Sequence, residues 1–382
     1  MTQANNVAIE SSQINSSGVL QPAGGGTGTA SGVTDFKNRI INGAMVIDQR
    51  NSGNSAALGA GGPGYALDRW AYYVPNNTSG TIQQVSDAPT GFVNSLKFTQ
   101  GTGTTVTTQN EIYQPIEGYN VSDLGFGTAN AKTITISFWV KSSLTGTFNI
   151  AIENQSSSRA YVSTYSISSA NTWTQASVTI PGDTTGTWLT NNSTGLNVLF
   201  SLGQSASFQT TPNAWTAGDY KGSSGAVSVV ATTGATWQLT GVQLEVGSSA
   251  TNFAYRSYGT ELALCQRYYQ NVMYSGPYAN STVGQDHGSA QYRFPFTFPQ
   301  IMRSSPSITT AAITSFRGNG VNGDNDLTSG TITINNIFPQ GFGLFITSMS
   351  PNPSTAAGQA IILNTASTIS GNTVVVAASA EL

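Results

Sequence analysis

The stretch Arg256-Ser-Tyr-Gly-Thr-Glu-Leu-Ala-Leu-Cys-Gln-Arg-Tyr-Tyr269 decides how this chain divides, because it is the one convincingly helical segment between long regions of strand and turn pattern. Leu262, Cys265, Tyr268 and Tyr269 recur at the spacing that places side chains on one helical face. A helix this short is marginal alone, so its apolar face is expected to pack on a sheet or on the same helix of another subunit. These four residues are therefore a candidate oligomer interface.

The composition is typical of an all-β protein of the extracellular kind. Only 8% of the 382 residues are charged, and 42 are glycine, which serves turns, while Ser, Thr and Asn suit the solvent faces of strands. Hydrophobic residues make up 38% of the chain, enough to fill sizeable cores, so disorder is not expected.

Charge and cysteine content exclude several classes of function. A net charge of -3 gives no basic surface for nucleic acid, and no apolar run is long enough for insertion into a membrane. The start of the chain shows no secretory signal. Cys265 is the one cysteine, so no internal disulfide forms. We interpret it as an inert core thiol rather than a metal ligand or nucleophile, and we expect no cofactor and no metal.

Residues 38–255 show the alternation expected of a two-sheet sandwich. Apolar side chains occupy every second position in three runs, at 134–140, 148–152 and 196–202. The run from Trp237 to Val246 changes phase at Gly241, which predicts a β-bulge. We expect eight to ten strands in a jelly-roll-like β-sandwich.

A smaller β domain is expected at 271–382, after a helical linker at 256–270. Tyr292, Phe294, Phe296 and Phe298 alternate strictly, and Pro295 within that run favours an edge strand because proline lacks a backbone donor. Residues 1–37 are rich in Gly, Ser and Thr, which indicates a flexible connector or a disordered leader.

Several phrases of the sequence resemble bacteriophage tail fibre proteins. They are Asn38-Arg-Ile-Ile-Asn-Gly-Ala-Met-Val-Ile-Asp-Gln-Arg50, Leu67-Asp-Arg-Trp70, Trp237-Gln-Leu-Thr-Gly-Val-Gln-Leu-Glu-Val-Gly247 and the Cys-Gln-Arg-Tyr-Tyr that ends at Tyr269. The resemblance implies a sandwich like that of carbohydrate-binding modules, a C-terminal fibre head and a homotrimer. It also implies a virion protein made in the host cytoplasm that acts extracellularly, attached to other virion tail proteins through its N-terminal region.

The carboxylates offer poor candidates for catalysis. A glycan-cleaving enzyme needs two carboxyl groups facing one cleft, and the available pairs are Glu111 with Glu117 and Asp324 with Asp326. Carboxylates between glycines and asparagines, as in 318–327, are usually turn formers, and this loop lacks the ligand spacing of an EF-hand. We therefore predict no catalytic residues.

Trp70 is expected in the core, with Asp68 and Arg69 pairing with neighbours such as Glu245.

Ligand contacts are expected in loops that present aromatic rings beside polar groups, since sugars offer hydroxyl edges and apolar faces. Two regions fit this description, and packing of each aromatic ring in the protein interior is the alternative. The candidate residues are Trp215, Asp219 and Tyr220 in the first region, and Tyr274, Tyr278, Asn280, Asp286 and His287 in the second.

The sequence therefore favours an adhesion protein that binds a host surface polysaccharide or an outer-membrane receptor without catalysis. Two alternatives stay open. One is a purely structural virion component of the tail, baseplate or head decoration, and the other is a glycan depolymerase.

Overall fold

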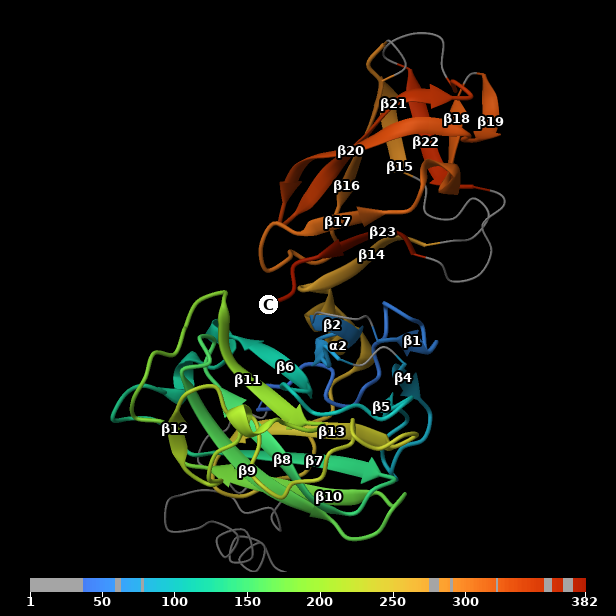
Figure 1. The fold of residues 1–382 in the computed structure, drawn as a ribbon. Helices are drawn as coiled ribbons and strands as arrows, with labels where there is room; N and C mark the ends of the chain where they lie inside the picture. Colours follow the sequence, from blue (N-terminus) through green and yellow to red (C-terminus); the bar gives the residue numbers. More distant parts are fainter. Residues whose placement is uncertain are drawn as a thin grey trace, which may run out of the picture.

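The protein forms two β-rich lobes joined near α2 (Tyr258–Gln266), as a computed structural model shows (Figure 1). The structure describes residues 37–58, 63–76, 79–274, 282–288, 291–320, 322–353, 359–366 and 374–382. The connector predicted for residues 1–37 lies outside the described residues, except for residue 37. The all-β fold class is confirmed, with a two-sheet sandwich followed by a helix and a second β lobe.

The sandwich consists of a six-stranded and a seven-stranded antiparallel sheet, more strands than the eight to ten expected. In spatial order, the first sheet contains β1 (Ala56–Ala57), β4 (Thr81–Val85), β5 (Ser95–Thr99), β13 (Thr236–Val246), β7 (Ile134–Ser142) and β10 (Thr174–Ile180). The second contains β12 (Trp215–Ala217), β9 (Arg159–Ile167), β8 (Gly146–Glu153), β11 (Thr194–Ser201), β6 (Glu111–Glu117), β3 (Trp70–Tyr73) and β2 (Pro63–Leu67).

The apolar alternation of the sequence forms the core between these sheets. Phe138 on β7, Phe148 on β8 and Phe200 on β11 are fully buried, and Trp70 is buried with them, as predicted. The predicted bulge is also confirmed. The pairing of β13 with β7 shifts register between Thr240 and Gln243, and Gly241 adopts φ 61°, a left-handed conformation that glycine tolerates.

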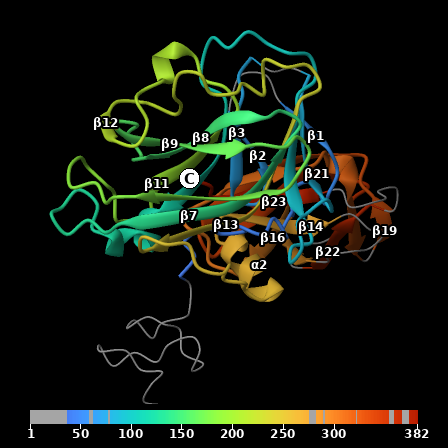
Figure 2. The same cartoon turned by 90° about the horizontal axis from the view of Figure 1, so that it is seen from below.

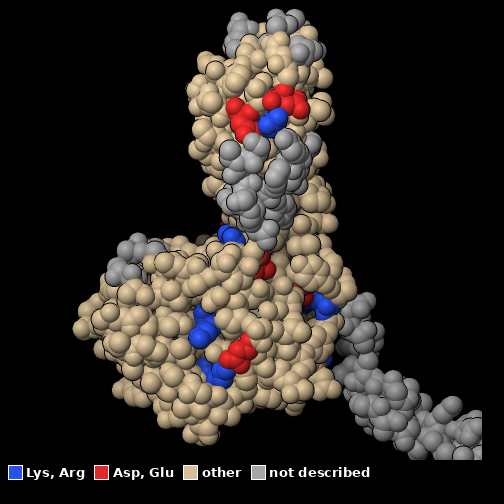
Figure 3. Space-filling model, turned by 90° about the vertical axis from the view of Figure 1, so that its right-hand side faces the viewer, with Lys and Arg blue, Asp and Glu red and all other residues tan. Residues whose placement is uncertain are grey.

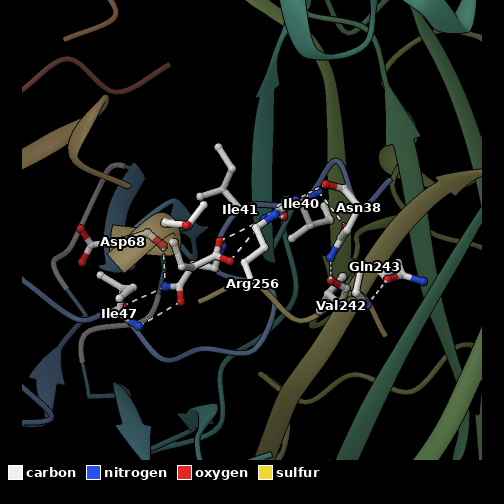
Figure 4. A network of polar contacts seen from close by, with 12 residues as sticks. Asn38, Ile40, Ile41, Ile47, Asp68, Val242, Gln243 and Arg256 are labelled. Atoms are coloured by element: carbon white, nitrogen blue, oxygen red, sulfur yellow. Dashed lines mark hydrogen bonds and ion pairs between the residues drawn. The ribbon is translucent and has the colours of Figure 1, made fainter. Parts of the chain in front are cut away.

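The phrase at 38–50 has a structural role as a brace along β13 (Figure 4). Asn38, which is buried, donates from Nδ2 to the carbonyl of Val242 at 3.0 Å and accepts from the amide of Leu244 at 3.0 Å. Arg256 donates to the carbonyl of Ile40 at 2.9 Å, which ties the segment before α2 to the same brace. These bonds satisfy buried backbone groups that no strand partner reaches.

α2 packs against its own chain. Ser257 caps the helix by accepting from the amide of Thr260, and Figure 2 shows the helix beside the sandwich rather than between its sheets. Its buried contacts join Cys265 and Tyr268 with Ile41 and Ile47 of the 38–50 segment.

The four residues predicted as an oligomer interface are buried in, or pack against, apolar parts of their own chain, and the interface stays a prediction. Cys265, Tyr268 and Tyr269 are buried inside one chain, and Leu262 packs on the same cluster. Tyr269 is also not helical, because β14 (Tyr269–Tyr274) begins there. Of the two partners left open for the helix, the structure provides the sandwich of the same chain.

The second lobe, called the head here, contains two further antiparallel sheets. The three-stranded sheet has the order β14, β23 (Val374–Ser379) and β17 (Ser307–Thr310). The seven-stranded sheet has the order β19 (Gly323–Asp326), β18 (Phe316–Gly320), β22 (Ala360–Thr365), β15 (Thr282–Asp286), β16 (Gln291–Thr297), β21 (Gly341–Ser350) and β20 (Ser329–Phe338). Tyr292, Phe294 and Phe296 fill its core, as their alternation predicted.

The prediction that Pro295 marks an edge strand is wrong. β16 lies inside the sheet, between β15 and β21. Its pairing with β15 covers only Arg293 and Tyr292, so the ladder on that side ends before it reaches Pro295. A proline is tolerated within a sheet where the ladder does not require its missing donor.

The head is fastened to the sandwich by its last residues. Glu381 pairs with Arg69 and, at 2.7 Å, with Arg50, while Arg303 donates to the carbonyls of Ala380 and Glu381. The predicted partner of Arg69 was therefore wrong, because Glu245 accepts hydrogen bonds from Thr251 instead. A buried arginine needs a carboxylate, and the distant end of the chain supplies it.

Candidate functional site

The outer face of the seven-stranded sheet of the sandwich carries an open surface groove. On β8, Phe148, Ile150 and Ile152 point into the core, so Thr147, Asn149, Ala151 and Glu153 point outward. Residues 203–225, which include η4 (Ala206–Phe208), cross this outer face. The groove lies between that segment, the start of β8 and the second half of β9.

The groove has a volume of about 580 Å³ and an uncharged, hydroxyl-rich lining. Thr147 and Thr164 come from β8 and β9, and the segment that crosses them supplies Ala206, Gln209, Thr210, Thr211, Pro212, Ser223, Ser224 and Gly225. Six of these ten residues bear hydroxyl groups, which both donate and accept hydrogen bonds.

Two asparagines hold the groove in shape. Asn149, which is buried, donates to Ser223 Oγ at 2.9 Å and accepts from the amide of Ser223 at 3.0 Å. On the other side, Asn213 accepts from Ser163 Oγ at 2.7 Å and donates its amide to the carbonyl of Val162. Both walls are thus tied to the sheet, which reduces the cost of ordering them around a ligand.

Two tyrosines continue the same face beyond the groove. Ala151, Val162 and Leu199 form a small outer-face apolar cluster, and the partly exposed rings of Tyr113 and Tyr220 pack on it. A tyrosine ring that keeps one side in solvent offers an apolar face and a hydroxyl together.

Charged groups lie under and beside Tyr220. Lys221 is buried and its Nζ lies 3.0 Å from Glu153 Oε1, while it also pairs with Asp219. Burial raises the pKa of the Glu111 carboxyl to about 8, despite the attraction of the Lys221 ammonium. Burial raises the pKa of Glu153 in the same way. These groups fasten the crossing segment to the sheet.

The structure separates the three candidates of the first predicted region. Asp219 and Tyr220 lie at the outer face described above. Trp215 pairs with Tyr161 across β12 and β9, and it faces the inner side, in edge contact with Phe126 and Trp188 at 5.8 and 5.5 Å between ring centroids. Trp215 therefore does not lie with the other two.

The structure describes only part of the second predicted region. Tyr278 and Asn280 lie outside the described residues, and for Tyr274 the structure describes the strand but not the side chain. Asp286 is buried and accepts from the amide of Gly288 at 2.6 Å, which is the role of a turn former. His287 is exposed, and its amide donates to the carbonyl of Gln291.

The carboxylate pairs considered for catalysis have other contacts. Glu111 and Glu117 lie six residues apart on β6, about 20 Å at the usual rise of a strand, which is too far for a glycosidase pair. Glu117 instead receives hydrogen bonds from Arg267 and Tyr268. On the head, one basic side chain lies between two acidic ones (Figure 3). Arg317 pairs with the carboxylate of Asp326 at 3.2 Å and donates to the backbone carbonyl of Asp324 at 2.8 Å.

Sequence reasoning missed Thr147, Thr164, Tyr113, Glu153 and Lys221. The outward positions on β8 were visible as the polar half of its alternation, since the apolar half at 148, 150 and 152 marks the core. Nothing in the sequence indicates that residues 203–225 cross this particular face. Among the described residues, no cluster of His, Cys, Asp or Glu could hold a metal ion, and no helix could span a membrane.

Comparison with known proteins gives structural likeness alone. No family model and no curated protein matches the chain. Similar solved structures include the enzymatically active domain of tailspike protein 4 of bacteriophage CBA120, at 13% identity and a TM-score of 0.30, over 56% of this chain and 22% of that one. A CBM4 structure matches at 16% identity and a TM-score of 0.27, over 54% of this chain and 98% of that one.

A family 11 carbohydrate-binding module of a cellulosomal cellulase from Clostridium thermocellum matches at 14% identity and a TM-score of 0.25, over 51% of this chain and all of that one. Likenesses this distant carry no conclusion about ligand or activity, which has to be argued from the groove itself.

Proposed function

We propose that this chain is a non-enzymatic adhesion protein, a bacteriophage tail fibre that binds a host surface polysaccharide. The binding site is the groove on the seven-stranded sheet of the sandwich. The observation that carries the proposal is the uncharged lining of hydroxyl and amide groups, held in shape by Asn149 and Asn213, with Tyr113 and Tyr220 beside it. Placement on a virion rests on the sequence phrases quoted above.

The chemistry of the groove suits a neutral sugar chain. Sugar hydroxyls exchange hydrogen bonds with threonine, serine and glutamine side chains, and a pyranose ring presents a C–H face to a tyrosine. An open groove also accepts a polymer along its length, whereas a closed pocket would accept only a chain end.

Oligomerisation would turn weak sites into firm attachment. A homotrimer attached to the virion through its N-terminal region would present three grooves to one surface, so avidity would exceed the affinity of each groove by orders of magnitude. The structure of one chain leaves the trimer as a proposal that rests on the resemblance.

Bulky charged substitutions at the groove test the proposal. We expect Thr211→Arg, on the crossing segment, and Thr147→Arg, on β8, each to weaken binding to a panel of bacterial surface polysaccharides at least about tenfold, since both side chains are exposed in the groove. Thr232→Arg is the matched control, because Thr232 is also exposed but does not line the groove.

The outcomes separate the alternatives. Binding that survives both groove substitutions would remove the groove from the proposal. Binding only to virion proteins would favour a structural component, and release of reducing ends from a bound polysaccharide would favour a depolymerase.

A further inference from the structure

The outer face of the six-stranded sheet carries a second set of aromatic and polar side chains, on the opposite side of the sandwich from the groove. The strand registers place Lys97 opposite Gln238, and Gln238 opposite Lys141. Trp173 directly precedes β10, whose first residue pairs with Val140, so Trp173 lies next to Lys141. The four side chains form one row, about 14 Å long at the usual spacing of strands.

Asp87 binds this row together. Its carboxylate pairs with Lys141 and accepts from Trp173 Nε1 at 3.2 Å. Partial burial raises the pKa of Asp87, but the hydrogen bonds from Lys141 and Trp173 outweigh that effect and lower it. The Lys141 ammonium also lies 5.1 Å from the centroid of the Trp173 ring, so the indole is fixed at both its edge and its face.

A second indole lies beside the row, on the β-bulge. Trp139 pairs with the exposed Gln175 on β10, and the Trp139 and Phe92 rings pack so closely over Gly241 that a Cβ there would lie 2.7 Å from Phe92 and 3.0 Å from Trp139. The glycine therefore provides the flat backbone on which both rings lie. Trp139 and Trp173 remain partly exposed.

The row itself carries two cations and one anion. The cations are Lys97 and Lys141 and the anion is Asp87, while Glu245, further along the same face, is buried and accepts hydrogen bonds from Thr251. Lys97 has no ion-pair partner within the part of the chain that the structure describes. A lysine without a partner at one end of a row, with partly exposed indoles toward the other end, can pair with an acid group of a polymer whose rings lie on the indoles.

We propose that the outer face of the six-stranded sheet is a second carbohydrate site, specific for sugars that carry a carboxylate. Trp139 and Trp173 stack on rings of the polymer, Lys97 pairs with the carboxylate of a sugar further along it, and Gln175 and Asp87 bind hydroxyl groups. This site is separate from the groove, so either can fail in experiment while the other stands.

The test uses three carboxylated polymers, namely polygalacturonate, alginate and polysialic acid, with methyl-esterified polygalacturonate as the uncharged control. We expect the intact protein to bind at least one acidic polymer, to bind the ester at least about tenfold more weakly, and to lose affinity as salt is added. Calorimetry and quenching of tryptophan fluorescence provide two independent readouts.

Variants assign the binding to this face. We expect Lys97→Gln to weaken binding about two- to fivefold and to reduce its salt dependence, with Lys132→Gln, at another exposed lysine, as the unaffected control. Trp173→Ala should weaken binding about tenfold or more, whereas Trp173→Phe should retain part of it because the ring remains. Thr211→Arg in the groove should change nothing.

Three results would overturn the proposal. These are no binding to any of the three polymers, equal binding to the esterified polymer, and binding by Lys97→Gln and Trp173→Ala equal to that of the intact protein. Because Lys97 lies at the surface in no ion pair, the Lys97→Gln result stays informative even if Trp173→Ala fails to fold.

Discussion

Glu111 is a residue whose ionisation the fold opposes, because its carboxyl is buried. Its pKa of about 8 in the folded chain exceeds the ordinary value of 4.5, so the folded protein keeps a proton that the unfolded chain releases. The stability it contributes is present below pH 4.5 and is lost as pH rises through 8. We expect Glu111→Gln to remove this loss, gaining on the order of 2–4 kcal/mol relative to the native chain at pH 9 and little at pH 4.

Urea unfolding of both proteins at the two pH values checks this prediction. Glu117→Gln, on the same face of β6, is the control for which the opposite change in stability is expected. Burial raises the pKa of the Glu117 carboxyl, but hydrogen bonds from Arg267 and Tyr268 outweigh burial and lower it. Removal of that carboxylate should destabilise the protein at neutral pH. An equal response of Glu111→Gln at pH 4 and pH 9 would contradict the argument.

Single residues were predictable where local pattern decides their position, and not where a distant segment does. Trp70 was placed in the core from its strand context, and it is buried. Trp215 was a candidate ligand residue on the same kind of local reasoning, yet it faces inward, because pairing of β12 with β9 sets the side on which it points. The partner of Arg69 lies 312 residues away, beyond any local signal.

The bulge in β13 allows the stability cost of backbone strain to be measured apart from the cost of side-chain collision. Gly241 and Gly234 both have positive φ, but a Cβ at Gly241 would collide with Phe92 and Trp139, whereas one at Gly234 meets nothing within 4 Å. We expect Gly234→Ala to cost about 1 kcal/mol from backbone strain alone, and Gly241→Ala to cost about 2–4 kcal/mol. Urea unfolding measures both, and equal costs would show that the rings are free to move aside.

Elements with strong alternation were predicted correctly, because a half-buried strand records its inner face in its sequence. The strands at 134–142 and 236–246, and the bulge between their pairings, are examples. The helix was found but extended too far, since Tyr269 continues the apolar spacing while belonging to β14. For Pro295 the sequence did not reveal how far β15 would pair.

At the scale of the whole molecule, the attachment of the head to the sandwich could not be predicted, because it depends on side chains that no sequence pattern brings together. Arg50 stacks on the rings of Tyr65 and Tyr269, at 4.8 and 3.8 Å from their centroids, and Arg69 lies 3.6 Å from that of Tyr268. Both arginines also pair with the carboxylate of Glu381, which makes this side chain one of the links between the two lobes.

Glu381→Gln should therefore lower the stability of the whole protein against unfolding. Arg69 is only 1% exposed, and removal of the carboxylate leaves its charge buried without compensation, a change that costs about 3–5 kcal/mol. Asp123→Asn is the matched control, since its partner Arg39 is partly exposed and an exposed pair contributes no more than about 1 kcal/mol. Calorimetric unfolding should show one transition for the native chain and for Asp123→Asn, and a lowered or divided transition for Glu381→Gln. If Glu381→Gln unfolds like Asp123→Asn, the two lobes are held by their apolar contacts, and the buried arginines are stabilised by their aromatic neighbours rather than by the carboxylate.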